Sequence, residues 1–374
     1  MHHFITAFII TVLLGFADVL SATTEPSSTT SLVSGFRFHT GFLINHHNRM
    51  KILNEKPPQA YEFFIAKTTA GEKSWNSFYG YPQIGVSYML FDLGSPSFIG
   101  NAHCVYPFVN FFLTDVERII SLNMQFNAGG AYVEKIFDPV DNYKNTVVST
   151  HLNAILGVGI EGRLRLFKNM YLSGGLAFTH ISNGTFKKPN AGANFVTTFA
   201  ATSYQFSVSS LKMLANFNPE YSNLKPETSN LKFEIYFSGG IKSYTIYDDK
   251  KYAISGLSFE LSRSHLDFTC ISGAFELFYD TSDYASLHRN EIKTSRLQTV
   301  KPGITAGYSF LFGKFSAIVQ AGGYLYAKNH EYGFIYQRLA LKYYVSEHIS
   351  FRLGLKTHWG QADYLELSIG YKIK

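Results

Sequence analysis

Two side chains separated by a single residue, His180 and Ser182, have the types that nucleophilic catalysis needs. A serine hydroxyl is a weak nucleophile until a neighbouring base takes its proton, and histidine is the commonest such base. Residues two apart on a β-strand project to the same side, so both groups would face one surface. The pair predicts acyl transfer by Ser182 with His180 as general base, although such pairs are common and often simply meet solvent.

The segment that carries the pair, residues 171–182, indicates a strand with one apolar and one polar face. The side that bears the pair also bears the apolar residues Leu172, Leu176 and Phe178. Polar groups that face lipid lose the hydrogen bonds of water, so a pair placed there needs a reason. We expect a lipid ester presented near the membrane surface, with Asn183, Gly184 and nearby backbone N–H groups supporting the oxyanion.

The same alternation recurs along the chain after residue 30. The final segment is the clearest, with one apolar face that consists of Leu365, Leu367, Ile369, Tyr371 and Ile373. Strands of outer-membrane barrels alternate in this way because one face meets lipid and the other faces the lumen. The predicted fold is therefore all-β, a single antiparallel transmembrane β-barrel of about 14–16 strands formed by residues 23–374.

The first 22 residues predict a signal peptide, because residues 4–20 are mostly apolar and Ala22 suits the cleavage position. No later stretch reaches the roughly 20 apolar residues of a spanning helix, so strands must cross the membrane. The connections are mostly short at one end of the barrel and long at the other, with 70–82 and 208–230 as exceptions. This asymmetry predicts periplasmic N- and C-termini in a bacterial outer membrane.

The composition offers little support for other classes of function. The net charge of +6 is modest and the basic residues are scattered, so we expect no nucleic-acid partner. Zinc, haem and phosphate-loop spacings do not occur, and we expect neither a metal nor a cofactor. The adjacent His46 and His47 lack a third ligand and are predicted to face solvent. Cys104 and Cys270 lie on different predicted strands, and a disulfide between them is the less favoured alternative.

Several short motifs resemble the lipid A 3-O-deacylase (PagL-like) family of outer-membrane enzymes. The closest are His180–Gly184 (HISNG) and Pro189–Asn194 (PNAGAN), with weaker likeness at His151–Asn153 and at residues 79–87. The similarity covers about residues 60–206. Residues 207–374 have no counterpart in compact eight-stranded members, and we expect them to enlarge the barrel.

The resemblance implies a serine esterase that removes the acyl chain ester-linked at the 3-position of lipid A, within lipopolysaccharide of the outer leaflet. By position, His180 is the general base, Ser182 the nucleophile, and Asn183 and Asn190 support the oxyanion. The family's third triad member is a glutamate, but this chain has Asn194 there. An amide can orient the histidine but cannot balance its positive charge. Another carboxylate, Glu134 or Asp141, is the alternative.

Two other functions stay open at this point. One alternative is a non-catalytic barrel, either a channel or a structural or binding protein, since sixteen strands are enough to enclose an aqueous lumen. The other alternative is an outer-membrane phospholipase, which differs from a lipid A esterase only in its substrate.

Overall fold

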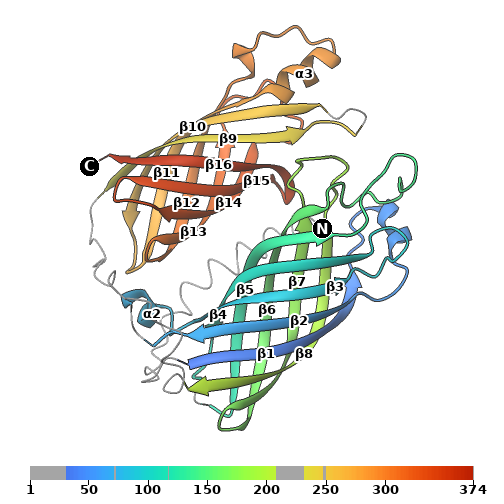
Figure 1. The fold of residues 1–374 in the computed structure, drawn as a ribbon. Coiled ribbons are helices and arrows are strands. Elements are labelled where there is room, and N and C mark those ends of the chain that lie inside the picture. Colours follow the sequence, from blue (N-terminus) through green and yellow to red (C-terminus); the bar gives the residue numbers. More distant parts are fainter. Residues whose placement is uncertain (1–30, 71–72, 117, 208–230, 247–249, 374) are drawn as a thin grey trace. The chain divides into compact units, whose positions relative to one another are not determined.

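The structure, a computed structural model, describes residues 31–70, 73–116, 118–207, 231–246 and 250–373 (Figure 1). Antiparallel strands make up most of it, which confirms the predicted all-β class. None of the helices in these ranges is long and apolar enough to span a membrane. The predicted signal peptide, residues 1–22, lies outside the described residues.

The first eight strands form a closed barrel in which each strand pairs with the next and β8 pairs with β1. Thirteen residue pairs join β1 to β8, from Ser31↔Ser207 to Leu43↔Phe195. The strands are β1 Ser31–Leu43, β2 Gln59–Thr68, β3 Gln83–Asp92, β4 Asn101–Phe112, β5 Ile120–Val133, β6 Leu152–Phe167, β7 Met170–Ser182 and β8 Ala193–Ser207.

The next eight strands form a second closed barrel, in which β9 pairs with both β10 and β16. Its strands are β9 Lys232–Ser243, β10 Lys251–Ser264, β11 Thr269–Asp280, β12 Lys301–Phe312, β13 Phe315–Tyr324, β14 Ile335–Tyr344, β15 Ile349–His358 and β16 Gln361–Ile373. The sixteen strands of the described residues agree with the predicted number of about 14–16.

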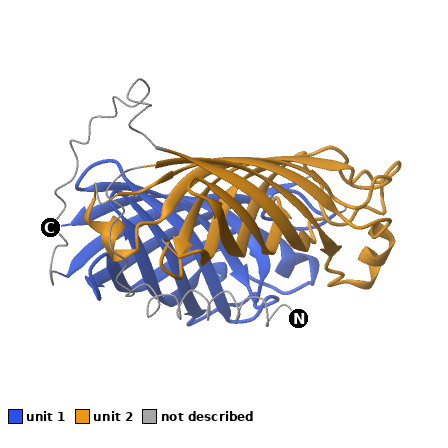
Figure 2. Ribbon diagram, turned by 90° about the horizontal axis from the view of Figure 1, so that it is seen from below, with its two compact units in different colours: residues 1–13, 184–188, 224–374 blue, residues 14–183, 189–223 orange. Residues whose placement is uncertain are grey.

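The prediction of one large barrel is wrong, because the strands close as two barrels of eight. Once β1 has paired with β8, neither edge of β8 is left for β9, which pairs with β16 instead. The 208–230 exception thus falls between the last strand of one barrel and the first strand of the other. The chain also divides into two compact units, in which residues 184–188 group with the second barrel (Figure 2).

Short helical segments lie in the connections: η1 Asn48–Leu53, α2 Ser74–Phe78, α3 Thr281–Arg289 and η3 Leu297–Thr299. The α2 segment lies in the long 70–82 connection, where Trp75 and Tyr79 are buried.

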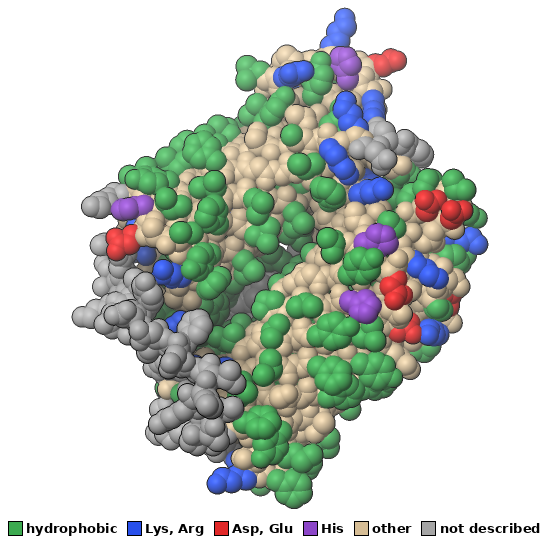
Figure 3. Space-filling view, viewed as in Figure 1, with side chains coloured by type: hydrophobic (Ala, Val, Ile, Leu, Met, Phe, Trp, Pro, Cys, Tyr) green, Lys and Arg blue, Asp and Glu red, His purple; other side chains and the backbone are tan. Residues whose placement is uncertain are grey.

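The outer walls of the barrels carry the apolar faces of their strands, and hydrophobic side chains cover much of the visible surface (Figure 3). In the first barrel Phe63 and Ile65 are exposed while their neighbour Phe64 is buried. In the second barrel Leu367 and Ile369 are exposed while Ser368 is buried. Apolar residues outside and polar residues inside are the arrangement of a barrel that sits in lipid.

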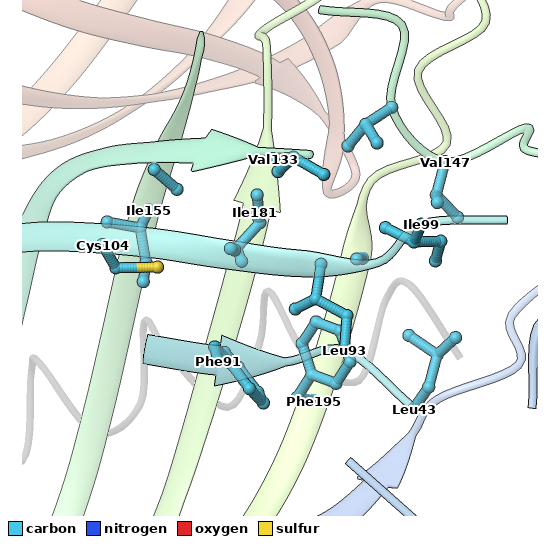
Figure 4. Close-up of a cluster of buried hydrophobic side chains, with 14 of the residues drawn as sticks. Leu43, Phe91, Leu93, Ile99, Cys104, Val133, Val147, Ile155, Ile181 and Phe195 are labelled. Carbon is cyan, nitrogen blue, oxygen red and sulfur yellow. The ribbon is translucent and has the colours of Figure 1, made fainter. Parts of the chain in front are cut away.

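Charged side chains cross the lumen of the first barrel. Arg37 on β1 bonds Glu62 on β2 at 3.0 Å and reaches Glu161 on β6 at 2.9 Å. Toward the end where odd-numbered strands finish, apolar side chains fill the interior, including Leu43, Phe91, Ile181 and Phe195 (Figure 4). The interior is thus packed along its length by side chains of both kinds.

Ion pairs also cross the second barrel. Arg338 on β14 lies 2.8 Å from Glu276 on β11 and 2.7 Å from Glu366 on β16. Lys342 on β14 lies 3.0 Å from Glu234 on β9. Buried charges of this kind are retained when each has a partner, and here the partners come from strands on different sides of the lumen.

Candidate active site

His180 and Ser182 lie at the end of β7 and are close enough to share a proton. His180 Nε2 is 2.9 Å from Ser182 Oγ, the distance of a good hydrogen bond. Because both residues follow the alternation of β7, the spacing in sequence becomes adjacency in space. The geometry is that of a hydroxyl with a base positioned to take its proton.

The pair belongs to the outer wall of the first barrel. On β7, Leu172 and Leu176 are exposed, whereas Tyr171, Ser173 and Ile181 are buried. Ile181, which lies between the two residues of the pair, points into the interior cluster (Figure 4). His180 and Ser182 therefore share the face of Leu172 and Leu176, at the end of the barrel where the longer connections lie.

Asn194 contacts the ring nitrogen of His180 that Ser182 does not contact. It is the register partner of His180 across the β7–β8 ladder, and its Oδ1 lies 2.7 Å from His180 Nδ1. Its main-chain carbonyl accepts a hydrogen bond from Ile44 N–H at 2.8 Å, which continues the β1–β8 ladder beyond Leu43. The amide oxygen can accept a hydrogen bond from Nδ1–H and so favours the tautomer whose Nε2 is free to act as base.

The sequence offered two carboxylates as alternatives to Asn194, and neither contacts His180. Glu134 accepts hydrogen bonds from the backbone and side chain of Asn101. Asp141 is exposed in a loop, where its N–H donates to Asp138 Oδ1. Both ring nitrogens of His180 are already engaged, one by Asn194 and the other by Ser182.

The segment that follows β7 folds back over the pair. A Cβ added to Gly192 would lie 2.8 Å from His180 Cε1 and 3.4 Å from Ser182 Cβ, so only glycine fits this contact. The φ of +75° at Gly192 also favours glycine. Backbone bonds from Ala191 N–H to Thr146 O at 3.1 Å and from Gly192 N–H to Val147 O at 3.0 Å anchor the segment.

The predicted oxyanion residues have other partners in this structure. Asn183 N–H donates to Asn190 Oδ1 at 3.1 Å, and Asn183 Nδ2 donates to Ser149 Oγ at 3.1 Å. Asn183 thus holds the turn together. Gly184 adopts a left-handed conformation with φ of +60°, which takes the chain out of β7. Because the oxygen of the Asn190 amide is engaged, its NH₂ group is the one turned away from Asn183.

His46 is part of the site, contrary to the expectation that it faces solvent. Its Nε2 lies 3.1 Å from Ala191 O, and its Nδ1 lies 3.4 Å from Asn194 Nδ2 and 3.3 Å from Ile44 O. Burial lowers the pKa of His46 below its usual 6.5, and the nearby His47 acts in the same direction. The loop that carries His46 lies next to Asn194 because β1 pairs with β8, and the sequence pattern does not predict this pairing.

The remaining expectations concern metals and cysteines. No group of three or more His, Cys, Asp or Glu side chains that could hold a metal ion occurs in the ranges that the structure describes. Cys104 and Cys270 are both buried free thiols, one in each barrel.

Two family models match the chain, and each falls on one barrel. The model described as lipid A 3-O-deacylase (PagL) matches residues 59–203. The model described as acyloxyacyl hydrolase, C-terminal domain, matches residues 231–374. His180, Ser182 and Asn194 lie inside the first match, whereas His46 precedes it. No curated protein matches the chain.

Solved structures of outer-membrane proteins resemble the chain weakly. The crystal structure of the outer membrane enzyme PagL is 14% identical over 45% of this chain and 97% of its own, with a TM-score of 0.30. Neisserial surface protein A is 9% identical over 47% of this chain and 97% of its own, with a TM-score of 0.30. A porin mutant of Rh. blastica is 10% identical over 92% of this chain and 100% of its own, with a TM-score of 0.18.

Proposed function

Because this chain belongs to the lipid A 3-O-deacylase family, we propose that it removes the 3-position acyl chain of lipid A by nucleophilic attack of Ser182. Membership makes it an ester hydrolase of the bacterial outer membrane. The serine mechanism rests on one observation above all, the 2.9 Å contact between His180 Nε2 and Ser182 Oγ. No metal or cofactor is needed for this chemistry.

The proposed reaction has two halves. In the first, His180 Nε2 takes the Ser182 proton while Oγ attacks the ester carbonyl carbon and forms a tetrahedral intermediate. The bond from carbonyl carbon to the sugar oxygen then breaks, and that oxygen takes the proton from His180. In the second half, a water molecule loses a proton to His180 and attacks the carbonyl carbon of the acyl-serine. The bond from that carbon to Ser182 Oγ then breaks, Oγ takes the proton from His180, and the fatty acid leaves.

Asn194 keeps His180 in the state that this reaction needs. The Asn194 amide oxygen, 2.7 Å from Nδ1, accepts a hydrogen bond from Nδ1–H, so the lone pair of the neutral ring is on Nε2 beside Ser182. The amide carries no negative charge, so it orients the imidazole without balancing the charge that forms on it. We therefore expect a slower enzyme than one with a carboxylate at this position.

Asn190 is the better candidate for oxyanion stabilisation than Asn183. The Asn183 N–H is used within the turn, and its side-chain NH₂ is used by Ser149 in the loop before β6. The Asn190 amide is held by its oxygen, which leaves its NH₂ group to donate to a developing negative charge. Ser182 itself is only 4% exposed, so an ester must displace part of the Asn190–Gly192 segment to reach it.

An open channel is the less favoured function. The Arg37–Glu161 pair crosses the first lumen and the Arg338–Glu276 pair crosses the second, where water and solutes would have to pass. Small barrels of eight strands have interiors that side chains can fill. The outer wall, and not the lumen, is the surface that carries the reactive pair.

Mass spectrometry of lipid A tests the proposal. Cells that make the wild-type chain should carry lipid A lacking the 3-linked acyl group, and cells that make Ser182→Ala should not. The matched control is Ser173→Ala, a buried serine on the inner face of the same strand, which should behave as the wild type. Identical lipid A in all strains would reject lipid A as the substrate. Purified protein given phospholipid in parallel would then show whether it is a phospholipase.

A further inference from the structure

We propose that His46 is a positioning residue that fixes the orientation of the Asn194 amide, so that the amide oxygen faces His180. His46 Nδ1 lies 3.4 Å from Asn194 Nδ2, on the side of the amide opposite to His180. This inference rests on the proposed function, because it gives His46 a role in the same serine mechanism.

An asparagine at this position creates a problem that a glutamate does not have. The two oxygens of a carboxylate are equivalent, whereas the two ends of an amide are an acceptor and a donor. If the Asn194 amide turned over, its NH₂ group would face His180 Nδ1 and favour a lone pair there. The His180 proton would then be on Nε2, and the ring could not accept the proton of Ser182. Something must hold the amide in one orientation.

His46 can do so because its own proton has one favourable place. With the proton on Nε2, His46 donates to Ala191 O at 3.1 Å, and the Nδ1 lone pair accepts from Asn194 Nδ2 at 3.4 Å. With the proton on Nδ1, His46 donates to Ile44 O at 3.3 Å. The unprotonated Nε2 then faces Ala191 O, and neither atom can donate a hydrogen bond to the other. The first arrangement satisfies two contacts and the second only one.

The backbone keeps both contacts of His46 in place. Ile44 N–H bonds Asn194 O at 2.8 Å, which ties the loop after β1 to the start of β8. Ala191 N–H bonds Thr146 O at 3.1 Å, which fixes the carbonyl that receives the Nε2 proton. The hydrogen bonds then run in one direction, from Ser182 to His180, from His180 to Asn194, from Asn194 to His46 and from His46 to Ala191.

Kinetics of four variants test this role. His46→Phe keeps a ring but removes both nitrogens, and we expect kcat to fall by about ten- to a hundredfold, the scale of a misplaced catalytic group, with KM within about twofold. In an Asn194→Glu background the same substitution should change kcat by less than about twofold, because a carboxylate has no wrong orientation. His47→Phe, at the exposed neighbour, is the matched control and should behave as the wild type.

A second measurement separates this inference from the proposed function. Nitrogen-15 NMR of histidine-labelled protein reports which ring nitrogen of His180 carries the proton, whether or not the protein cleaves lipid A. We expect Nδ1–H in the wild type and loss of that preference in His46→Phe, with gel migration of the unheated sample showing that the barrel is folded. The same tautomer in both proteins, or equal loss of kcat with and without Asn194→Glu, would overturn the role of His46. If the wild type is inactive but shows the expected tautomers, the proposed esterase function is rejected. The role of His46 in orienting Asn194 then still stands.

Discussion

His180 on β7 and Asn194 on β8 are direct partners in an antiparallel ladder, and a hydrogen bond of 2.7 Å joins their side chains. Directly opposed residues have their Cβ atoms close together on one face of the sheet, so barrel pairing alone brings these side chains into contact. Ser182 then lies two residues along the same strand. The rigid wall of the barrel, and not a mobile loop, sets the geometry of the proposed triad.

Replacing Asn194 with alanine should reduce the rate without destroying the site. His180 would lose the acceptor at Nδ1, and its ring would sample the tautomer that cannot accept the Ser182 proton. We expect kcat to fall by about a hundredfold, typical of an orienting group, while KM changes little. Steady-state kinetics on a lipid ester check this. Unchanged kcat would mean that Asn194 does not orient the base.

Gly192 should tolerate no side chain. Gly192→Ala places a Cβ 2.8 Å from His180 Cε1, and either the ring or the segment must move. We expect at least about a tenfold loss of kcat with the barrel still folded. Gly333→Ala is the control, because Gly333 has a φ of +83° but nothing within 4 Å of an added Cβ. Equal effects of both variants would point to backbone strain and not to the contact with His180.

The ion-pair network inside the first barrel should make a large contribution to its stability. Arg37→Met would leave Glu62 and Glu161 buried without their cation, and breaking such a buried pair costs about 3–5 kcal/mol. Arg118→Met, at an exposed arginine, is the control and should stay within about 0.5 kcal/mol. Urea unfolding in lipid vesicles, followed by tryptophan fluorescence, measures both. A loss below about 1 kcal/mol for Arg37→Met would contradict the account of the interior.

The alternation of residues predicts the strands well but says nothing of which edges pair. Any barrel size gives the same period of two, so one barrel of sixteen strands and two of eight are indistinguishable on this pattern. Val147 and Val148 show a local failure of the same reasoning. The alternation predicts a strand over residues 147–166, but β6 begins at Leu152. Both valines are buried in the loop before it, where their N–H groups lie 3.3 Å from Asn145 Oδ1.

Some residues of the candidate site could be predicted from the sequence and one, His46, could not. The spacing of His180 and Ser182 follows from the strand period, and the place of Asn194 came from resemblance to a family. His46 is 148 residues from Asn194 in sequence, and its position depends on the closure of β1 against β8. A contact of this kind is set by long-range pairing and leaves no local pattern in the sequence.

Acid should affect the enzyme through His46 as well as through the base. Burial lowers the pKa of His46 below 6.5, so its neutral form persists at neutral pH and protonation begins only in more acidic solution. The titratable groups near it are His47 and His180, whereas Asn194 and the carbonyls of Ile44 and Ala191 do not titrate. A protonated His46 cannot accept a hydrogen bond from Asn194, so its protonation should lower kcat as His46→Phe does, whereas protonation of His180 should abolish activity.

Protonation of His46 in acid should lower both the activity and the stability of the protein. A histidine whose pKa is lower in the folded state binds protons more readily when unfolded, so its contribution to stability is full above pH 6.5 and declines below it. In the pH range where His46 titrates, the slope of log kcat against pH should rise above 1 for the wild type and stay at or below 1 for His46→Phe, because the wild type has one protonation that abolishes activity and a second that lowers kcat. Equal slopes would contradict a separate role of His46.

The most direct test asks whether Ser182 is a nucleophile activated by His180. Purified protein in detergent is treated with a fluorophosphonate, and intact and peptide mass spectrometry locate the adduct. We predict one phosphonyl group on Ser182 in the wild type, and none in Ser182→Ala or His180→Gln under the same conditions. An enzyme that deacylates lipid A yet carries no adduct on Ser182, or labels equally well without His180, would contradict the serine mechanism.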